Sequence, residues 1–116
     1  MSSAASRPRV TFFVQAFNTA AFVGECLESI LNQKGVSDFE VLVIDDASTD
    51  ATPQEIARFK DSRLHVVRHE RNQGAIATAN EGYAYGSAPF VVRVDSDDRL
   101  RPEFLQRAVP LLEAHA

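Results

Sequence analysis

The sequence contains a single cysteine, no apolar run long enough to span a bilayer and neither of the common glycine-rich phosphate motifs. Cys26 therefore has no partner for a disulfide within the chain, and its place on an apolar helical face predicts a packed small side chain rather than a nucleophile. A membrane-spanning helix needs roughly 18 apolar residues, so none is predicted. Because the loops G-x-G-x-x-G and G-x-x-x-x-G-K-S/T are missing, a metal ion is the favoured partner for any bound phosphate.

Positive charge is also scarce, because 12 lysines and arginines face 16 aspartates and glutamates and leave a net charge of −4. This balance argues against nucleic acid as a partner and against general attraction to anionic membranes. The 116 residues, 45% of them hydrophobic, suffice for one domain with a modest core. We predict a flexible leader over residues 1–9, one domain over residues 10–116, and a cytoplasmic location, with any membrane association made through parts of the protein outside this chain.

Four β-rich segments alternate with four segments of helical character. The strands are predicted at residues 10–14, 39–44 and 64–67 and in the run that begins at Phe90. The helices are predicted from Asn18 or Thr19 to near Gly35, from a capping box at residues 52–55, over residues 75–85, and from Pro102 onward, where Pro110 should kink or shorten the last one. This alternation predicts a Rossmann-like α/β fold, a right-handed and mostly parallel sheet with helices on both faces.

Polar side chains follow every predicted strand. They occupy residues 15–18, 45–46, 69–74 and 95–98, whereas the opposite connections at 35–38, 60–63 and 86–89 are short turns with fewer distinctive groups. Ligands of parallel sheets bind beyond the carboxyl ends of the strands. The sequence therefore predicts one site built by four loops at a single edge of the sheet.

Three carboxylates within four residues end the last predicted strand, at Asp95, Asp97 and Asp98. Carboxylates at this density need solvent, protonation or a cation. Oxygen ligation by one or two carboxylates, with water and phosphate filling the other positions, suits Mg²⁺ or Mn²⁺. A solvated acidic loop without a metal is the alternative that these residues alone leave open.

Other polar residues of this edge have structural interpretations beside the functional ones. Asp45 is predicted to fix the turn that follows it, whereas its neighbour Asp46 is predicted to contact a ligand. Phe17 could plug the core instead of contacting a base, and Asn80 could satisfy backbone groups. His69 is predicted to lie at the edge without touching the ligand.

Five motifs occur in a fixed order, namely F-F-V-Q-A-F-N, C-L-E-S-I-L-N-Q, D-F-E-V-L-V-I-D-D-A-S-T-D, N-Q-G-A-I-A-T-A-N-E-G and V-D-S-D-D-R-L-R-P-E-F-L. Together they resemble the nucleotide-sugar-binding half of family 2 glycosyltransferases, which have the GT-A fold. The resemblance covers nearly everything from Val10 onward, with the same spacing. It implies metal-dependent, inverting transfer of a sugar from a nucleoside diphosphate sugar, of the UDP type, to a hydroxyl of a saccharide, lipid or other acceptor.

The resemblance also implies a role for each matching residue. Gln15 and Phe17 would line the base, Asp46 would hydrogen-bond it, and the Asn72-x-Gly74 turn and Asn80 would lie beside the nucleotide. The stretch D-S-D-D matches the D-x-D element. Its leading carboxylates, Asp95 and Asp97, would reach the nucleotide sugar, and the trailing pair, Asp97 and Asp98, would reach the divalent cation, Mg²⁺ or Mn²⁺, and the diphosphate.

Three positions depart from the family's usual pattern. Gln15-Ala16 stand where Pro-Thr is common, Phe17 replaces a tyrosine, and Ala79 occupies a position that is often basic. We therefore expect the base contacts to differ in detail. Arg71 or Arg93 could supply the diphosphate contact that Ala79 lacks.

The resemblance places the catalytic base after the donor half, so the base is expected beyond Ala116 and the chain is interpreted as a truncated donor-binding portion. An exposed sheet edge or apolar patch could then promote self-association. One alternative is a non-catalytic sugar-nucleotide-binding module, which the sequence leaves open. Another is a phosphoacceptor signalling domain, but that class has its paired carboxylates after the first strand and a lysine at a late strand end, whereas the only lysines here are Lys34 and Lys60.

Overall fold

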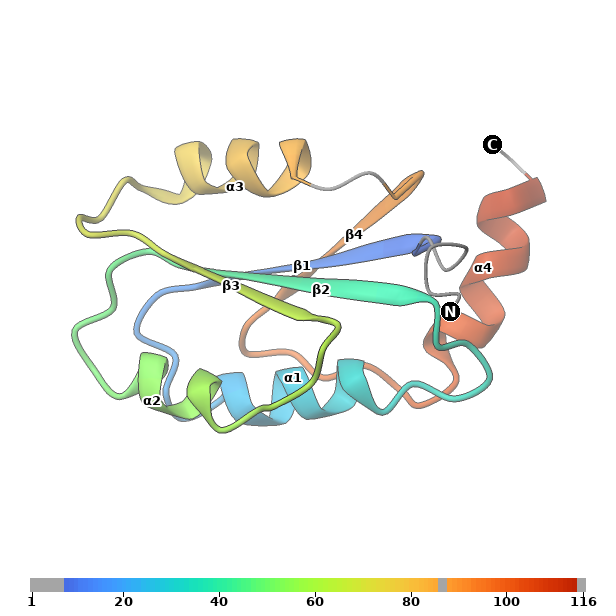
Figure 1. Cartoon of the computed structure of the whole chain (residues 1–116), viewed down its shortest axis with the longest axis horizontal. Helices are drawn as coiled ribbons and strands as arrows, with labels where there is room; N and C mark the ends of the chain where they lie inside the picture. The colour runs from blue at the N-terminus through green and yellow to red at the C-terminus, as the bar shows by residue number, and fades with distance from the viewer. Residues whose placement is uncertain (1–7, 86–87, 115–116) are drawn as a thin grey trace.

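The computed structural model describes residues 8–85 and 88–114, which form alternating strands and helices (Figure 1). The elements are β1 (Val10–Ala16), α1 (Val23–Leu31), β2 (Phe39–Asp45), α2 (Thr52–Ala57), β3 (Leu64–Arg68), α3 (Ala75–Ala84), β4 (Phe90–Asp95) and α4 (Phe104–Ala114). Most of the predicted leader, residues 1–7, lies outside the described residues, as does part of the predicted turn at 86–89. Arg9, at the end of that leader, is held against the domain by an ion pair with Asp38 (2.5 Å).

All four strands run parallel in one sheet, in the order β3-β2-β1-β4. The register pairs Ala16 with Asp45, Asp45 with Arg68, and Gln15 with Asp95. The last residues of the strands therefore lie side by side, along what we call the carboxyl edge. The predicted Rossmann-like α/β fold is confirmed.

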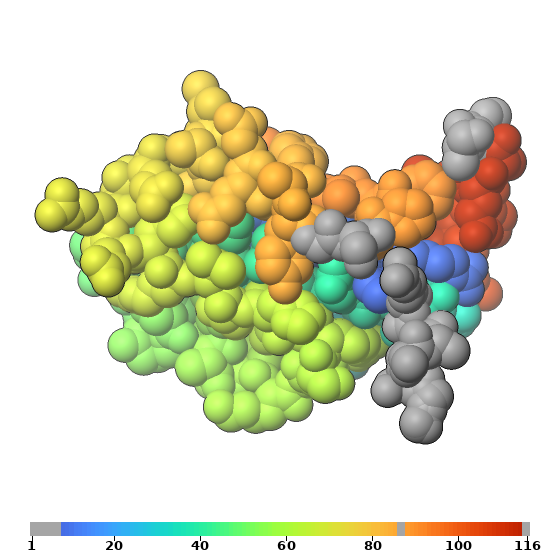
Figure 2. Space-filling view, turned by 45° about the horizontal axis from the view of Figure 1, so that its top comes forward, coloured from blue at the N-terminus to red at the C-terminus, as the bar shows by residue number. Residues whose placement is uncertain are grey.

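Helices cover both faces of the sheet, as predicted. In Figure 1, α1 and α2 lie on one face and α3 on the other, while α4 stands near the edge where the strands begin. The larger part of the core lies on the α1 side and includes Phe12, Leu27 and Leu105, whereas the core on the α3 side is built on Phe13, Leu42 and Ile44. Figure 2 shows β4 at the surface between α3 and α4. This strand is accordingly only partly buried.

Helix α3 approaches the sheet closely because its residues are small. Gly82 is buried, and a Cβ atom at this position would overlap the ring of Phe13 on β1. The next residue, Tyr83, places its ring 5.9 Å from the Phe13 ring, centroid to centroid. A glycine at position 82 therefore allows α3 to lie close against β1.

The strands extend further toward the carboxyl edge than the sequence predicts. The prediction ends the first strand at Val14, but Gln15 and Ala16 continue the parallel pairing with β2. Strands β2 and β3 are each one residue longer than predicted for the same reason. A polar side chain ends an apolar run in the sequence without ending the backbone hydrogen-bond ladder. Gln15 is consequently held by the sheet rather than by a loop.

Two predicted helix caps are wrong. Asn18 lies five residues before α1, and its side-chain oxygen accepts a hydrogen bond from the Thr49 N–H (2.8 Å). The hydroxyl of Thr19, the alternative cap, has no hydrogen-bond partner among the described residues. The capping box at residues 52–55 is absent, because the Thr52 hydroxyl donates to Asp50 (2.5 Å) and accepts from the Thr19 N–H (2.9 Å). In both cases a side chain that could cap a helix instead joins two loops at the carboxyl edge.

The ends of α1 and α4 also differ from the prediction. Helix α1 ends at Leu31 instead of near Gly35, because the following backbone turns toward the segment before α4. Helix α4 is not shortened at Pro110 and continues to Ala114. Val109 is buried before the proline and Leu112 is half-buried after it, so packing supports the helix on both sides. Among the helices of the described residues, none has the length and apolarity of a membrane crossing.

Candidate functional site

The polar residues predicted to share one edge do lie at the carboxyl edge. The Asp46 N–H donates to the carbonyl of Ala16 (2.9 Å), and the His69 N–H donates to the carbonyl of Asp45 (2.9 Å). These bonds continue the ladder for one step beyond the strands. Asp46 follows β2 and Asp95 ends β4, so the two carboxylates stand on either side of β1 at the same edge.

The acid triad, defined as Asp95, Asp97 and Asp98, forms a compact cluster of oxygen ligands. All three side chains are exposed, and each offers an oxygen within 4.8 Å of those of the other two. A tight turn gathers them, since the Asp98 N–H donates to the Asp95 carbonyl (2.9 Å). Three carboxylates with open solvent on one side fit a hard divalent cation that keeps water or phosphate among its ligands.

Cys26 lies beneath the acid triad and is fully buried in α1. Its Sγ donates a weak hydrogen bond to the Asp95 carbonyl (3.5 Å). Burial, and then the nearby carboxylates, raise the pKa of this thiol to about 12. The thiol is therefore neutral at physiological pH, in agreement with the packed side chain that the sequence predicts.

The carboxylate of Asp46 is buried and takes part in several hydrogen bonds. One oxygen accepts from the Gln73 N–H (2.8 Å) and pairs with His69 Nδ1 (2.8 Å), and the other accepts from the Gly74 N–H (3.0 Å). Burial acts to raise the pKa of Asp46, but these donors outweigh it and the net effect lowers that pKa. Asp46 is therefore an ionised acceptor with capacity left on its second oxygen.

A hollow of about 280 Å³, which we call the edge pocket, adjoins this carboxylate. Its lining residues are Gln15, Phe17, Asp46, Asn72, Gly74 and Ala75. The ring of Phe17 is 47% exposed, so this residue is not a core plug. The Gln15 amide donates to the Ala75 carbonyl (3.0 Å), while its Oε1 is buried without a partner in the described part of the chain. The pocket thus combines an aromatic face with two acceptors.

Asp45 has the structural role that the sequence predicts. Its buried carboxylate accepts hydrogen bonds from the Ser48 N–H (3.0 Å) and hydroxyl (2.5 Å), and it pairs with Arg68 (2.9 Å). These bonds close the turn after β2. The two adjacent aspartates therefore face different partners, one the turn and the other the edge pocket.

The loops after β1 and β2 are fastened to each other. Besides the Asn18–Thr49 bond, the Asn18 N–H donates to the Ser48 hydroxyl (2.9 Å). The backbone of Asn18 (φ 52°) and Ala47 (φ 61°) is left-handed in this region. That conformation is unfavourable for alanine, which has no polar side chain to compensate. The loop that carries Phe17 is thus held in place by bonds that also sustain local backbone strain.

We expect Ala47→Gly to raise the free energy of unfolding by about 1 kcal/mol, because glycine adopts a positive φ without a Cβ penalty. Urea unfolding followed by circular dichroism would measure the change. In the matched variant Asn18→Gly, the same relief is offset by loss of the hydrogen bond to Thr49, so no gain is expected. A lower stability of Ala47→Gly would contradict the inferred strain.

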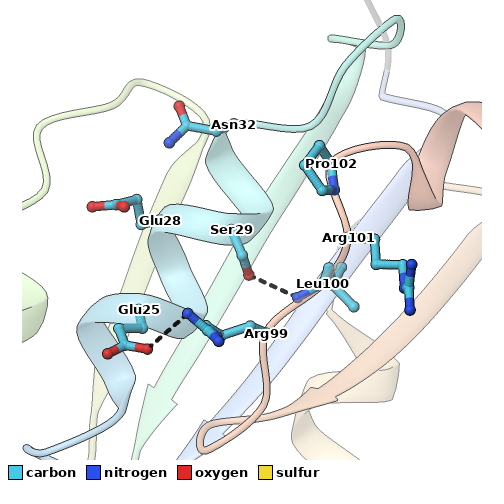
Figure 3. Close-up of a pocket in the computed structure, with 8 residues that line it drawn as sticks. All are labelled: Glu25, Glu28, Ser29, Asn32, Arg99, Leu100, Arg101 and Pro102. Carbon is cyan, nitrogen blue, oxygen red and sulfur yellow. Dashed lines mark hydrogen bonds and ion pairs between the residues drawn. The ribbon is translucent and has the colours of Figure 1, made fainter.

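A larger hollow of about 470 Å³ lies between α1 and the segment after the acid triad (Figure 3). Figure 3 shows Arg99 paired with Glu25 (3.3 Å) and the Leu100 N–H donating to the Ser29 hydroxyl (2.9 Å). These contacts tie the segment to α1 and so help to fix the acid triad. The described lining of this hollow includes no residue of the edge pocket or the triad.

The structure brings most of the predicted site residues together, with one clear exception. Asn72 donates to the Asp46 carbonyl (3.2 Å), and Gly74 (φ 91°) opens α3 beside the pocket. Asn80 is exposed in the middle of α3 and does not line the pocket as described. Arg71 and Arg93 are the suggested substitutes for a basic residue at position 79. A guanidinium nitrogen of Arg93 lies 3.8 Å from a carboxylate oxygen of Asp95, so Arg93 stands beside the acid triad.

One contact of the site is missed by the sequence interpretation. His69 joins Asp46 to Glu81, which lies on α3. The bonds span 23 and 12 positions of the chain, and His69 lies outside all five motifs, although Glu81 is part of N-Q-G-A-I-A-T-A-N-E-G. Only the placement of α3 over the sheet reveals the connection.

Comparison with known proteins gives a family match over almost the whole domain. The model of the family described as Glycosyl transferase family 2 matches residues 11–116. The succinoglycan biosynthesis protein ExoO of Rhizobium meliloti is 38% identical over 107 residues, which make up 92% of this chain and 30% of ExoO. The chain thus spans about a third of the length of such relatives.

Solved structures give the same result. TarS of S. aureus in complex with UDP-GlcNAc superposes with a TM-score of 0.84 at 31% identity, over 92% of this chain and 32% of TarS. The mannosyltransferase PcManGT of Pyrobaculum calidifontis, in complex with GDP-Man and Mn²⁺, gives a TM-score of 0.82 at 32% identity, over 91% and 32% of the two chains.

Proposed function

This chain belongs to glycosyltransferase family 2, and from that premise we propose that it binds the nucleoside diphosphate sugar for transfer to an acceptor hydroxyl. One observation carries the proposal. The edge pocket and the acid triad lie at the same edge of the sheet, with β1 between the strands that supply Asp46 and Asp95. A nucleotide needs such an arrangement, with a base site and a diphosphate site a short distance apart.

The edge pocket is proposed as the base site. Phe17 offers an exposed ring on which a base stacks, and aromatic faces bind bases of any identity. Asp46 and Gln15 Oε1 offer acceptors, which suit the N–H group of a uracil-type base. Asn72 and Gly74 fix the wall of the pocket through their bonds to Asp46. These features support a UDP-type donor.

The acid triad is proposed as the diphosphate and cation site. Asp97 and Asp98 would hold the divalent cation, Mg²⁺ or Mn²⁺, and Asp95 with Asp97 would contact the donor. The all-oxygen ligand set and its exposure fit this role. A cation bound there would supply Lewis-acid stabilisation of the charge that develops on the leaving diphosphate.

The transfer itself is proposed to invert the configuration of the sugar. The acceptor hydroxyl attacks from the face opposite the diphosphate while a general base takes its proton. The new glycosidic bond forms as the bond to the diphosphate breaks, so the nucleoside diphosphate is released as the second product.

Calorimetry with UDP tests the proposal directly. We expect the chain to bind UDP in the presence of Mn²⁺ and to lose at least about tenfold in affinity when the cation is chelated, because the diphosphate then faces three uncompensated carboxylates. Equal affinity with Mn²⁺ and with chelator would contradict the cation site.

The variant Asp98→Asn separates the cation site from general charge effects. We expect UDP affinity in Mn²⁺ to fall by at least about 10- to 100-fold, the loss that is typical when only an outer-shell partner of a metal ligand is removed. The matched variant Glu113→Gln removes one negative charge from an exposed position on α4 and should leave the affinity unchanged. Similar losses in both variants would mean that net charge, and not ligation, controls UDP binding.

A further inference from the structure

His69 occupies an unusual position behind the edge pocket. It follows β3 directly, and its side chain is only 5% exposed. Its Nδ1 lies 2.8 Å from an oxygen of Asp46, and its Nε2 lies 2.7 Å from an oxygen of Glu81 on α3. The ring thus bridges the sheet and the helix on that face, with a carboxylate at each nitrogen.

The two contacts determine the protonation state of the ring. An ionised carboxylate only accepts hydrogen bonds, so each ring nitrogen must donate to satisfy its partner. A neutral imidazole has one N–H, whereas the imidazolium has two. Because both bonds are shorter than 3 Å, the geometry favours a charged His69 between two anions.

The charged surroundings of His69 are simple. Asp46 faces it from the end of β2 and Glu81 from α3. On its own segment, Glu70 and Arg71 are exposed. The preceding Arg68 is directed to Asp45 and the Ser48 carbonyl.

We propose that His69 is a positioning residue of the nucleotide site: anchored by Glu81, it holds one oxygen of Asp46 so that the other oxygen faces the edge pocket. The proposal rests on the proposed function, because it assigns the geometry of the base acceptor in that site. His69 itself does not line the pocket, so it acts through Asp46 and not by touching the nucleotide.

The positioning should depend on pH. The hydrogen bond to Asp46 raises the pKa of His69, against the opposing effect of burial and with further support from Glu81. The group is charged below its raised pKa, so the contribution to stability is complete below the ordinary histidine pKa of about 6.5 and is lost as the pH rises through the raised value. Donor affinity should fall over the same interval.

Two substitutions at His69 separate its two bonds. Asparagine places an amide N–H near the position of Nδ1, so His69→Asn keeps a donor for Asp46, whereas the longer His69→Gln keeps a donor only toward Glu81. With UDP-GlcNAc in Mn²⁺ as the probe, we expect His69→Gln to bind about tenfold more weakly, the cost of one charge-assisted bond. His69→Asn should bind more tightly than His69→Gln. Both variants should lose the fall in affinity that accompanies deprotonation of His69, which we call the pH step.

The matched control is His65→Gln. This histidine is 44% exposed on β3, beside Glu40 at 3.8 Å, and it makes no contact with Asp46 in the described structure. Its replacement should preserve both the affinity and the pH step. Unchanged affinity and pH dependence in the two His69 variants would overturn the proposal.

NMR titration of the unliganded wild-type chain provides a test that needs neither nucleotide nor variant. The amide protons of Gln73 and Gly74 donate to Asp46, so they should shift with the same midpoint as the His69 ring, above the ordinary histidine pKa. If the chemical shifts of these amide protons do not change as His69 titrates, the proposal is overturned. If the amides follow His69 but no UDP-sugar binds, the proposed function fails while the positioning of Asp46 by His69 stands.

Discussion

The variant Asp46→Asn should lose about 3–5 kcal/mol of the free energy of unfolding, because it leaves the buried, charged His69 without one of its two counter-ions. The new amide group also turns a donor toward either the Gln73 or the Gly74 N–H, both of which need an acceptor. Urea unfolding of the variant and the wild type at neutral pH would measure the loss. We expect UDP binding to disappear with it.

The control for this prediction is Asp61→Asn. Asp61 pairs with Arg63 (2.8 Å), but both side chains are more than a quarter exposed. Solvent weakens such pairs, so the expected loss is at most about 1 kcal/mol. Losses of similar size in the two variants would contradict the idea that Asp46 belongs to a buried charge network.

Gly82→Ala should lower the free energy of unfolding by about 3 kcal/mol. Alanine favours a helix over glycine by about 1 kcal/mol, but here its methyl group would overlap the ring of Phe13 in the core between α3 and the sheet. Overpacking a well-filled core costs about 1–3 kcal/mol and sometimes more. Thermal and urea unfolding would both report the loss.

The chain offers a matched glycine for this test. Gly24 lies in α1, and a Cβ there would meet the flexible Glu55 side chain at 3.6 Å, an ordinary contact. Gly24→Ala should therefore be neutral or stabilise the protein by about 1 kcal/mol.

Adding Phe13→Leu to Gly82→Ala should recover part of the lost free energy of unfolding, since leucine is smaller than phenylalanine. Additive effects of the two substitutions would show that they do not share a contact.

The fold and the location of the site follow from the sequence because both depend on regular patterns. Apolar runs of strand length and amphipathic segments alternate, and a parallel sheet places all strand ends on one edge. The different roles of Asp45 and Asp46 can also be predicted in part, since an aspartate at the end of a strand is placed to accept hydrogen bonds from the turn that follows. The structure confirms the turn bonds of Asp45.

Features that depend on the meeting of distant segments are not foreseeable in this way. Asn18 and Thr52 have the chemistry of helix caps, but in the folded protein their side chains find partners on neighbouring loops. His69 acquires its role only because α3 brings Glu81 to it. The same placement leaves Asn80 on the exposed side of α3. Local sequence patterns do not show when a side chain will bind a partner on a distant segment in place of a local one.

Because the strand ends are aligned, a change in the length of a strand should disturb the site more than a change in the length of a loop at the opposite edge. Inserting or deleting one residue within β1 would turn every later side chain of that strand to the opposite face and misplace Gln15 relative to Asp95. Insertions in the turns at the opposite edge, such as residues 60–63, would leave that alignment intact. Homologous sequences should therefore conserve strand lengths while their loop lengths diverge at the amino-terminal edge of the sheet.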